Sequence, residues 1–359
     1  RYHYHHCLRT HESGRSKIIQ TEHRFSERDY ESNSLMANWV KKTVQYILFL
    51  GIGVALLYLT FKNVNPIDLW NNLREVPVSG LLLVVAIGFI AIIFRGLRWV
   101  QMLQSLGYEV KGTRAIAAVA FSYLVNLVTP RVGEVARCTA LHKTDHVPID
   151  KLVGTVVLER VVDTLLFAVV TLSTVVISGD ELRDFMTQSG AQIPELSMAG
   201  TLSIVAVLVA ILGLVLFTRK IWMQWSIALK IAGFATGMIT GLRSLRTVNN
   251  KPLFWFYSIG IWTCYVVTIA VGFTIVEGVQ GIGAEQAFFV SVAAGLGFVI
   301  PVPGGIGAYH YLVSKALVVL GLSPFIGTSF ATLIHSSQSL MFVFTGALGF
   351  VFLYFAGRK

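Results

Sequence analysis

Charged residues are scarce in this sequence. Only 13% of its 359 residues are Asp, Glu, Lys or Arg, whereas a soluble domain usually carries about 25%. Hydrophobic residues make up 54%, and they lie in long blocks rather than at the periods typical of a half-exposed helix or strand. This composition excludes a soluble enzyme, a disordered tail and a fibrous protein. It predicts an all-α polytopic membrane protein.

Cysteine is also rare, and Cys7, Cys138 and Cys264 are far apart with no CxxC spacing. They indicate neither a disulfide nor a metal site. The sequence contains no P-loop, GxSxG, HExxH or paired-carboxylate hydrolase pattern. We therefore expect no catalytic residue, no metal and no cofactor.

The net charge of +10 would raise the question of nucleic acid in a soluble protein. Here Lys and Arg are concentrated in a few loops between hydrophobic blocks, which retention of positive charge on the cytoplasmic side explains better. No RNA- or DNA-binding motif competes with this interpretation. We expect no nucleic-acid partner.

Residues 1–35 differ from the rest of the chain, because they are polar, contain five histidines and lack any hydrophobic run. We interpret them as a disordered or non-native extension. Met36 is the first methionine and shortly precedes a basic pair and the first hydrophobic block, so we expect the native chain to begin there. Residues 36–359 would then form a single transmembrane domain.

Several hydrophobic blocks are long enough to cross a bilayer, because a spanning helix needs about 20 apolar residues. The six expected spans are residues 44–61, 78–95 (continuing helically to about 106), 152–178, 199–217, 253–276 and 325–355. Three runs are shorter: 115–128, 286–300 and 308–320. Residues 221–245 mix tryptophan with Lys and Arg, as an interfacial helix would.

The distribution of Lys and Arg orients these segments. Both flanks of the run 115–128 are basic, so it is predicted to enter from the cytoplasm and return as a re-entrant hairpin. Glu277 and Glu285 place the start of 286–320 outside, which predicts a second hairpin of opposite orientation. The order span, span, hairpin, span then occurs in about 44–178 and again in about 199–355, as in an inverted-topology repeat. Both termini are expected in the cytoplasm, and the protein in the plasma (inner) membrane.

The first backbone break carries candidates for binding a lipid phosphate. Arg131, Glu134 and Arg137 recur at three-residue spacing, so they share roughly one face of a helix that begins after Pro130. Arginine binds phosphate bidentately, and the helix N-terminus adds a positive dipole end. The alternative is a set of positive-inside charges with a local salt bridge. Asn126 and Gly133 complete the break.

Glu159, Arg160 and Asp163 are ionisable residues inside an expected span. Each costs about 2.5–3.5 kcal/mol on membrane-insertion scales, so such residues are candidates for function. Glu159 and Asp163 are four residues apart and face the same way. Arg160 could pair with either of them or with Glu134. A structural ion-pair network is the alternative.

A third group of candidates follows the second break. The residues that break the backbone there are Pro301, Pro303, Gly304, Gly305 and Gly307. They can bring the backbone close to a ligand, and His310 could serve as a proton-linked switch. Further candidates, with helix–helix hydrogen bonding or snorkelling as the alternative, are Tyr309, Lys315, His335 and Gln338. Arg95, Arg98 and Trp99 are interpreted as an ordinary interfacial belt.

Three stretches in this order resemble the transmembrane region of lysylphosphatidylglycerol synthase/flippase proteins. They are Thr-Pro-x-x-Gly-Glu-x-x-Arg ending at 137, Glu-Arg-x-x-Asp ending at 163, and Pro-x-Pro-Gly-Gly-x-Gly ending at 307. The resemblance covers about residues 40–355. It implies lipid translocation, since in two-domain members this region flips an aminoacylated lipid made by a cytosolic domain.

The sequence departs from that family in two respects. It ends at Lys359 without an acyltransferase-like domain, so lipid aminoacylation is not expected and we do not expect an enzyme. The family often places Glu in the helix after its Pro-Gly-Gly motif, where this chain has Tyr309 and His310. No carboxylate role is carried over to that position.

The leading hypothesis is a flippase or transporter for an anionic or aminoacylated lipid, phosphatidylglycerol-like or polyprenyl-phosphate-like. The residues assigned to the phosphate are Arg131, Arg137, Arg160 and Asn126, and those assigned to a charge network or coupling are Glu134, Glu159, Asp163 and His310. The alternatives are a scaffold for a separate glycosyltransferase or lipid synthase, and a lipid-modifying membrane enzyme. The sequence does not indicate the oligomeric state.

Overall fold

The computed structural model describes residues 43–177 and 248–358, and within these ranges the secondary structure is helical throughout, without a strand. Five of these helices are long and apolar enough to cross a membrane. They are Thr43–Phe61, α3 (Val78–Gln104), α6 (Ile149–Ile177), α11 (Lys251–Ile275) and α14 (Pro324–Ala356). The chain is therefore a multi-pass helical membrane protein. The expected span 199–217, the expected interfacial helix 221–245 and the extension 1–35 lie outside the described residues.

The shorter elements are α2 (Pro66–Glu75), α4 (Gly112–Val128), α5 (Val132–Asp145), α12 (Gln286–Val299), the 3-10 turn η2 (Pro303–Gly305) and α13 (Ala308–Val319). Of these, α4, α12 and α13 lie close to the expected runs 115–128, 286–300 and 308–320, whereas α2 was not expected. Local capping explains several starts, because Asn65, Asn250 and Ser323 each accept a hydrogen bond from a backbone N–H in the first turn of the following helix. Two helical hairpins result: the first consists of α4 and α5, and the second of α12 and α13.

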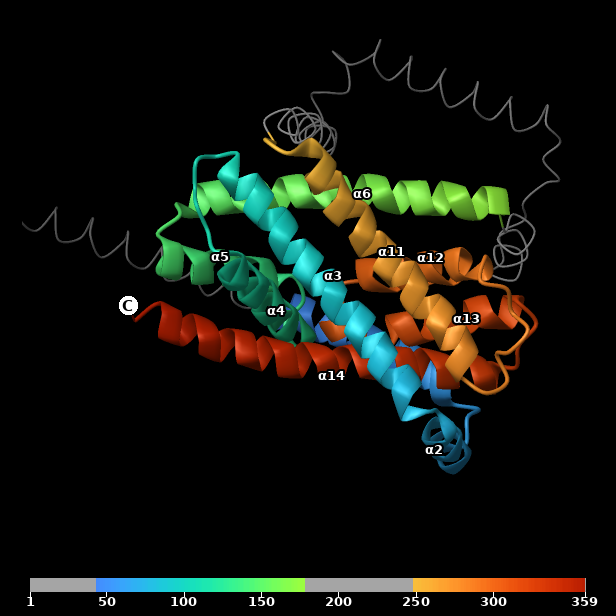
Figure 1. Ribbon diagram of the computed structural model, residues 1–359. Coiled ribbons are helices and arrows are strands. Elements are labelled where there is room, and N and C mark those ends of the chain that lie inside the picture. Colours follow the sequence, from blue (N-terminus) through green and yellow to red (C-terminus); the bar gives the residue numbers. More distant parts are fainter. Residues whose placement is uncertain (1–42, 178–247, 359) are drawn as a thin grey trace, which may run out of the picture. The chain divides into compact units, whose positions relative to one another are not determined.

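The chain divides at Ile52 and Gly53, and the packing described here belongs to the unit from Gly53 onward. In Figure 1, α3 and α11 lie side by side, and α14 runs past both α4 and α13. Two hydrophobic cores result. One surrounds Trp99, Leu103 and Leu141 near the first hairpin, and the other surrounds Phe273 and Phe330 near the second.

The turn of the first hairpin is closely packed. Thr129 has the extended conformation that a following proline favours, and Arg131 is left-handed with φ of 65°. Asn126 Oδ1 accepts the backbone N–H of Gly133 at 2.8 Å. A Cβ on Gly133 would lie 2.1 Å from the carbonyl oxygen of Ser122, so only glycine allows α4 and α5 to approach this closely.

The turns of the two hairpins meet. A Cβ on Gly304 would lie 3.1 Å from the side chain of Leu127. Arg131 Nη2 donates to the carbonyl oxygen of Val299 at 3.5 Å. Gly307 has φ of 87°, and a Cβ there would lie 2.1 Å from the carbonyl oxygen of Gly53. The Pro/Gly run thus brings backbone into contact with backbone.

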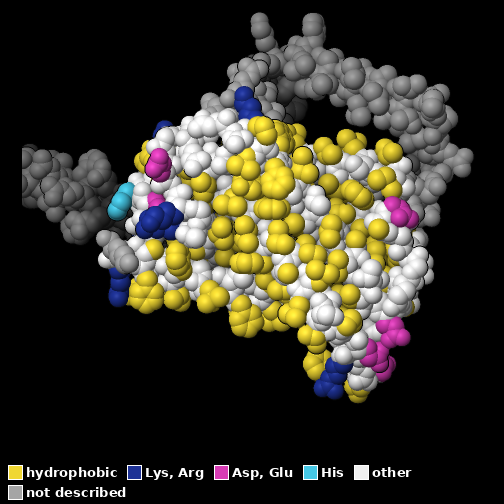
Figure 2. Space-filling model, viewed as in Figure 1, with side chains coloured by type: hydrophobic (Ala, Val, Ile, Leu, Met, Phe, Trp, Pro, Cys, Tyr) yellow, Lys and Arg dark blue, Asp and Glu magenta, His cyan; other side chains and the backbone are white. Residues whose placement is uncertain are grey.

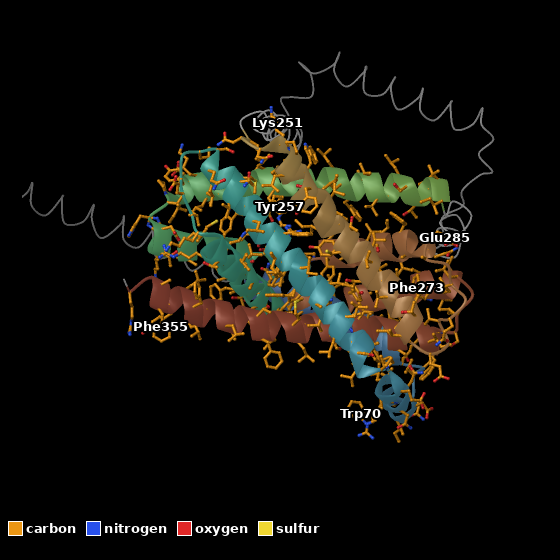
Figure 3. All side chains as sticks on the ribbon, viewed as in Figure 1. Trp70, Lys251, Tyr257, Phe273, Glu285 and Phe355 are labelled. Atoms are coloured by element: carbon orange, nitrogen blue, oxygen red, sulfur yellow. The ribbon has the colours of Figure 1, made fainter. Side chains whose placement is uncertain are left out.

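The outer surface suits a lipid environment. Figure 2 shows hydrophobic side chains over most of the face formed by α3, α11 and α14, with charged side chains near its margins. In Figure 3, Phe355 and Trp70 project away from the neighbouring helices, and they are 59% and 55% exposed.

Candidate functional site

A cluster of five charged side chains lies buried between α3, α5 and α6. Its members, called the buried charge cluster below, are Arg95, Arg98, Arg137, Glu159 and Asp163. None of the five residues is more than 8% exposed, and Arg98 and Glu159 are 0% exposed. Charged residues are almost never buried so completely unless they are paired.

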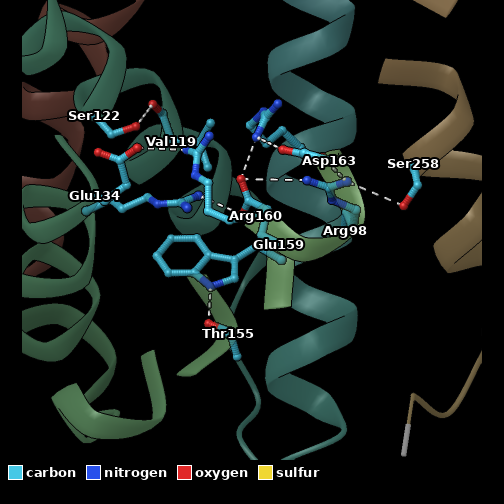
Figure 4. A network of polar contacts seen from close by, with 12 residues as sticks. Arg98, Val119, Ser122, Glu134, Thr155, Glu159, Arg160, Asp163 and Ser258 are labelled. Atoms are coloured by element: carbon cyan, nitrogen blue, oxygen red, sulfur yellow. Dashed lines mark hydrogen bonds and ion pairs between the residues drawn. The ribbon is translucent and has the colours of Figure 1, made fainter. Parts of the chain in front are cut away.

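Every carboxylate oxygen of the cluster is engaged by an arginine. Glu159 Oε1 accepts from Arg95 Nη1 at 2.5 Å, and Glu159 Oε2 accepts from Arg137 Nη1 at 3.0 Å. Asp163 Oδ1 accepts from Arg98 Nη1 at 2.8 Å, and its Oδ2 accepts from Arg95 Nη1 at 2.9 Å. Figure 4 shows Arg98 close to both carboxylates, with Ser258 of α11 nearby.

Helix periodicity produces this convergence. Arg95 and Arg98 are three residues apart on α3, and Glu159 and Asp163 are four apart on α6, so each pair occupies one face of its helix. Arg137 comes from α5, which the tight turn at Gly133 holds against α4. Two helices and the first hairpin thus supply the cluster.

Aromatic and hydroxyl groups surround the cluster. The Arg137 guanidinium lies 4.7 Å from the ring centroid of Trp99, whose Nε1–H donates to Thr155 Oγ1 at 2.7 Å. Tyr265 Oη accepts from Arg95 Nη2 at 3.1 Å, and Ser258 Oγ lies 3.5 Å from Arg98 Nη1. Tyr265 and Ser258 thus connect α11 to the charged side chains of α3.

The interpretation of Arg95, Arg98 and Trp99 as an interfacial belt was therefore wrong. A belt would hold these side chains at the membrane surface, whereas all three are buried against α6. One signal in the sequence could have found them: two carboxylates inside one span require cationic partners. An Arg pair inside another expected helix can supply them.

The first hairpin separates the three residues that were expected to share one face, Arg131, Glu134 and Arg137. Arg131 precedes α5 and has a left-handed backbone, so it is not on the helix that carries Glu134 and Arg137. Arg137 is buried in the cluster, so in this arrangement its guanidinium is not exposed to a lipid phosphate. Arg131 is exposed.

A second, more exposed ion pair lies beside the cluster. Arg160 Nη2 donates to Glu134 Oε1 at 2.7 Å, and this pair joins α6 to α5. The Arg160 side chain is 54% exposed and the Glu134 side chain 21%. Of the partners considered for Arg160, the structure shows Glu134. Arg160, Glu134 and Arg131 are called the exposed charge group below.

The second hairpin carries a separate polar cluster. His335 Nε2–H donates to the carbonyl oxygen of Gly304 at 2.9 Å, since a carbonyl can only accept. His310 Nδ1 accepts the backbone N–H of Gly307 at 3.4 Å, and the two imidazole centroids are 4.7 Å apart. Tyr309 packs against both rings. The sequence did not indicate that the two histidines are neighbours.

The remaining candidates have packing contacts. Gln338 Nε2 donates to the carbonyl oxygen of Val84 at 3.0 Å and so joins α14 to α3. Lys315 lies over the ring of Tyr311. Asn126 holds the hairpin turn described above. Among residues 43–177 and 248–358, no group of three His, Cys, Asp or Glu side chains is placed to hold a metal ion.

Comparison with known proteins gives the family. The model of the lysylphosphatidylglycerol synthase transmembrane region matches residues 46–349, which include both hairpins and the buried charge cluster. The chain belongs to the lysylphosphatidylglycerol synthase transmembrane-region family. The expected resemblance is thereby confirmed over nearly the whole described structure.

A second comparison finds a distant relative with a different name. The chain is 24% identical over 345 residues to a protein named glycosyltransferase AglD from Haloferax volcanii. The match covers 86% of this chain but 54% of AglD, so the chain spans about half the length of that relative.

Proposed function

We propose that this protein translocates an anionic or aminoacylated lipid across the bilayer, with the head group held at the exposed charge group. The observation that carries the proposal is Arg160, which lies eleven residues into the 29-residue span α6, about 16 Å from its start, yet is 54% exposed. An exposed guanidinium at that depth needs water or a polar ligand around it.

The proposed architecture gives this site a position near the midplane. In it, the two helical hairpins are re-entrant, the spans number six, and the halves form an inverted-topology repeat. Irregular backbone at membrane depth is tolerated where it lines a cavity or is buried in protein. The contact of Arg131 with Val299 supports this arrangement, because the two hairpin turns meet beside the exposed charge group.

The head-group phosphate would be held by Arg160 and Arg131. Arginine offers a planar fork of donors to phosphate oxygens. In the structure Arg160 is paired with Glu134. The lipid phosphate would therefore replace the Glu134 carboxylate as the partner of the Arg160 guanidinium. The released Glu134 could then bind the amine of an aminoacylated head group. The buried charge cluster would hold α3, α5 and α6 in position during this exchange.

Translocation in this scheme is downhill or gradient-driven, since the sequence offers no nucleotide-binding motif. His310 is the proposed proton-linked residue. Its Nδ1 accepts from Gly307 N–H in the neutral form, and a proton on Nδ1 would break that contact at the start of α13. The proposed location is the plasma (inner) membrane, with both termini cytoplasmic.

The match to AglD favours a second candidate. In that case the chain would serve a separately encoded glycosyltransferase or lipid synthase as a membrane scaffold, or would handle a polyprenyl-phosphate-linked sugar. The two roles differ in one requirement. A scaffold does not need the exposed charge group to bind phosphate, so it should tolerate the loss of Arg160.

The test is head-group translocation in proteoliposomes, with fluorescent phosphatidylglycerol, aminoacylated and polyprenyl-phosphate lipids. Arg160→Gln should reduce translocation at least about tenfold, because a charged hydrogen bond to phosphate contributes about 1.5–3 kcal/mol. The matched control is Arg114→Gln, which breaks the Arg114–Asp145 ion pair, 2.8 Å long and formed between α4 and α5. That variant should keep wild-type rates.

Two results would count against translocation. One is a folded wild-type protein that moves none of these lipids. The other is an Arg160→Gln variant as active as Arg114→Gln. Either result would favour the scaffold.

A further inference from the structure

The buried charge cluster contains one positive charge in excess. Three arginines face two carboxylates, and arginine cannot be deprotonated in proteins. All four carboxylate oxygens already accept from guanidinium nitrogens. The cluster therefore has a net charge but no free acceptor.

Several donors of the cluster are left over. Within the described part of the chain, no hydrogen-bond partner exists for Nε and Nη2 of Arg98, Nε and Nη2 of Arg137, or Nε of Arg95. Arg98 and Arg137 are 0% and 2% exposed, so water does not reach these groups freely. A buried guanidinium without enough acceptors destabilises the fold, because its charge has lost its hydration.

Arg98 and Arg137, the two arginines with unpartnered Nε and Nη2 groups, both contact Glu159. Arg98 Nη2 is 3.6 Å from Glu159 Oε1, and Arg137 Nη1 is 3.0 Å from Glu159 Oε2. Both guanidiniums therefore contact one carboxylate, one at each oxygen, and Nη2 of each lacks a hydrogen-bond partner. The ring of Trp99 lies against the Arg137 guanidinium, but an aromatic ring carries no negative charge and does not neutralise the excess.

The sequence limits which carboxylate could supply the missing charge. Between Glu195 and Glu277 there is no Asp or Glu, and none follows Glu285. Residues 199–247, which include the expected span 199–217, therefore contain no carboxylate side chain. Glu134, the carboxylate on the same hairpin as Arg137, is paired with Arg160.

We infer that the buried charge cluster binds one small inorganic monovalent anion, chloride in the cell, between Arg98 and Arg137. One excess charge calls for a monovalent ion. The burial favours a small ion without substituents over a phosphodiester, because none of the five residues is more than 8% exposed. This site is distinct from the exposed charge group and does not depend on lipid translocation.

The test is the line width of the chloride NMR signal with purified, delipidated full-length protein in a neutral detergent. The buffer holds gluconate at constant ionic strength. Wild type should broaden the signal saturably, and bromide should compete. Arg98→Gln removes the excess charge and should lose at least about tenfold in chloride affinity, since one buried charged hydrogen bond contributes about 1.5–3 kcal/mol.

The control is Arg160→Gln, which removes an arginine outside the cluster. It should bind chloride like wild type while losing lipid translocation, so the two proposals fail separately. No saturable broadening by wild type, equal broadening by Arg98→Gln, or displacement of chloride by equimolar short-chain phosphatidylglycerol would overturn the inference. If Arg98→Gln does not fold, anomalous scattering from bromide in wild-type crystals decides: a bromide between Arg98 and Arg137 supports the inference, and a cluster without one refutes it.

Discussion

Asp163 Oδ1 accepts a 2.8 Å hydrogen bond from Arg98 Nη1, and this ion pair joins α6 to α3 across 65 residues of sequence. The Asp163 side chain is 11% exposed and the Arg98 side chain 0%. Removing one partner of a buried ion pair strongly destabilises the folded state, because the other charge stays buried without compensation. The fold should therefore depend on this contact.

Asp163→Asn should lower the free energy of unfolding by about 3–5 kcal/mol, because it leaves Arg95 and Arg98 short of a charged acceptor. Unfolding in a denaturing detergent, followed by tryptophan fluorescence, measures the change. The control is Asp150→Asn, the same substitution on the same helix at a side chain 72% exposed. Its effect should stay within about 0.5 kcal/mol. Equal losses in both variants would show that the buried pair does not stabilise the fold.

Gly133→Ala should separate α4 from α5, because the added Cβ would lie 2.1 Å from the carbonyl oxygen of Ser122. The expected cost is about 1–3 kcal/mol, as for other overpacked sites. Gly154→Ala is the control, since a Cβ there meets nothing within 4 Å. Alanine is the better helix former, so that variant should be neutral or up to about 1 kcal/mol more stable. A Gly133→Ala variant as stable as wild type would mean that the hairpin turn is not closely packed.

A pair of carboxyl groups outside the spans predicts a dependence on pH. The neighbouring Glu277 raises the pKa of Glu75 above its ordinary value of 4.5, through a hydrogen bond and charge repulsion. A raised pKa in the folded state means that the contribution of Glu75 to stability is complete below the unfolded pKa. That contribution is lost as pH rises through the folded pKa.

Glu277→Gln removes the repelling carboxylate, so this variant should lose less stability than wild type between about pH 4 and pH 7. The thermal midpoint, measured across that range, tests this. Glu285→Gln is the control, because it changes an acid on the same connection that is not part of the pair. If the pH profiles of wild type and Glu277→Gln coincide, the two carboxyl groups do not interact in the folded protein.

The sequence by itself predicted the helices well. The block from 78 was expected to continue to about 106, and α3 ends at Gln104. The runs 286–300 and 308–320 correspond to α12 and α13 within one or two residues. These helix bounds are set locally, because proline and capping side chains act on the backbone within one or two turns.

The sequence also indicated that Glu159 and Asp163 require partners, since a carboxylate inside a span is costly wherever the rest of the chain lies. It did not indicate which arginines would meet them. Arg95 and Arg98 lie 61 to 68 residues away and look the same in sequence as an interfacial belt. Burial depends on which helix faces pack together, and that is a property of long-range contacts.

The tertiary structure alone therefore divided the arginines into two groups. Packing of α3 and α5 on α6 buries Arg95, Arg98 and Arg137. Arg160 neighbours Glu159 in sequence, but its side chain is 54% exposed and pairs with Glu134. Adjacent residues on a helix are about 100° apart around its axis. Composition and spacing therefore determined that charges enter the membrane, and only helix packing decided which of them are buried and which remain accessible.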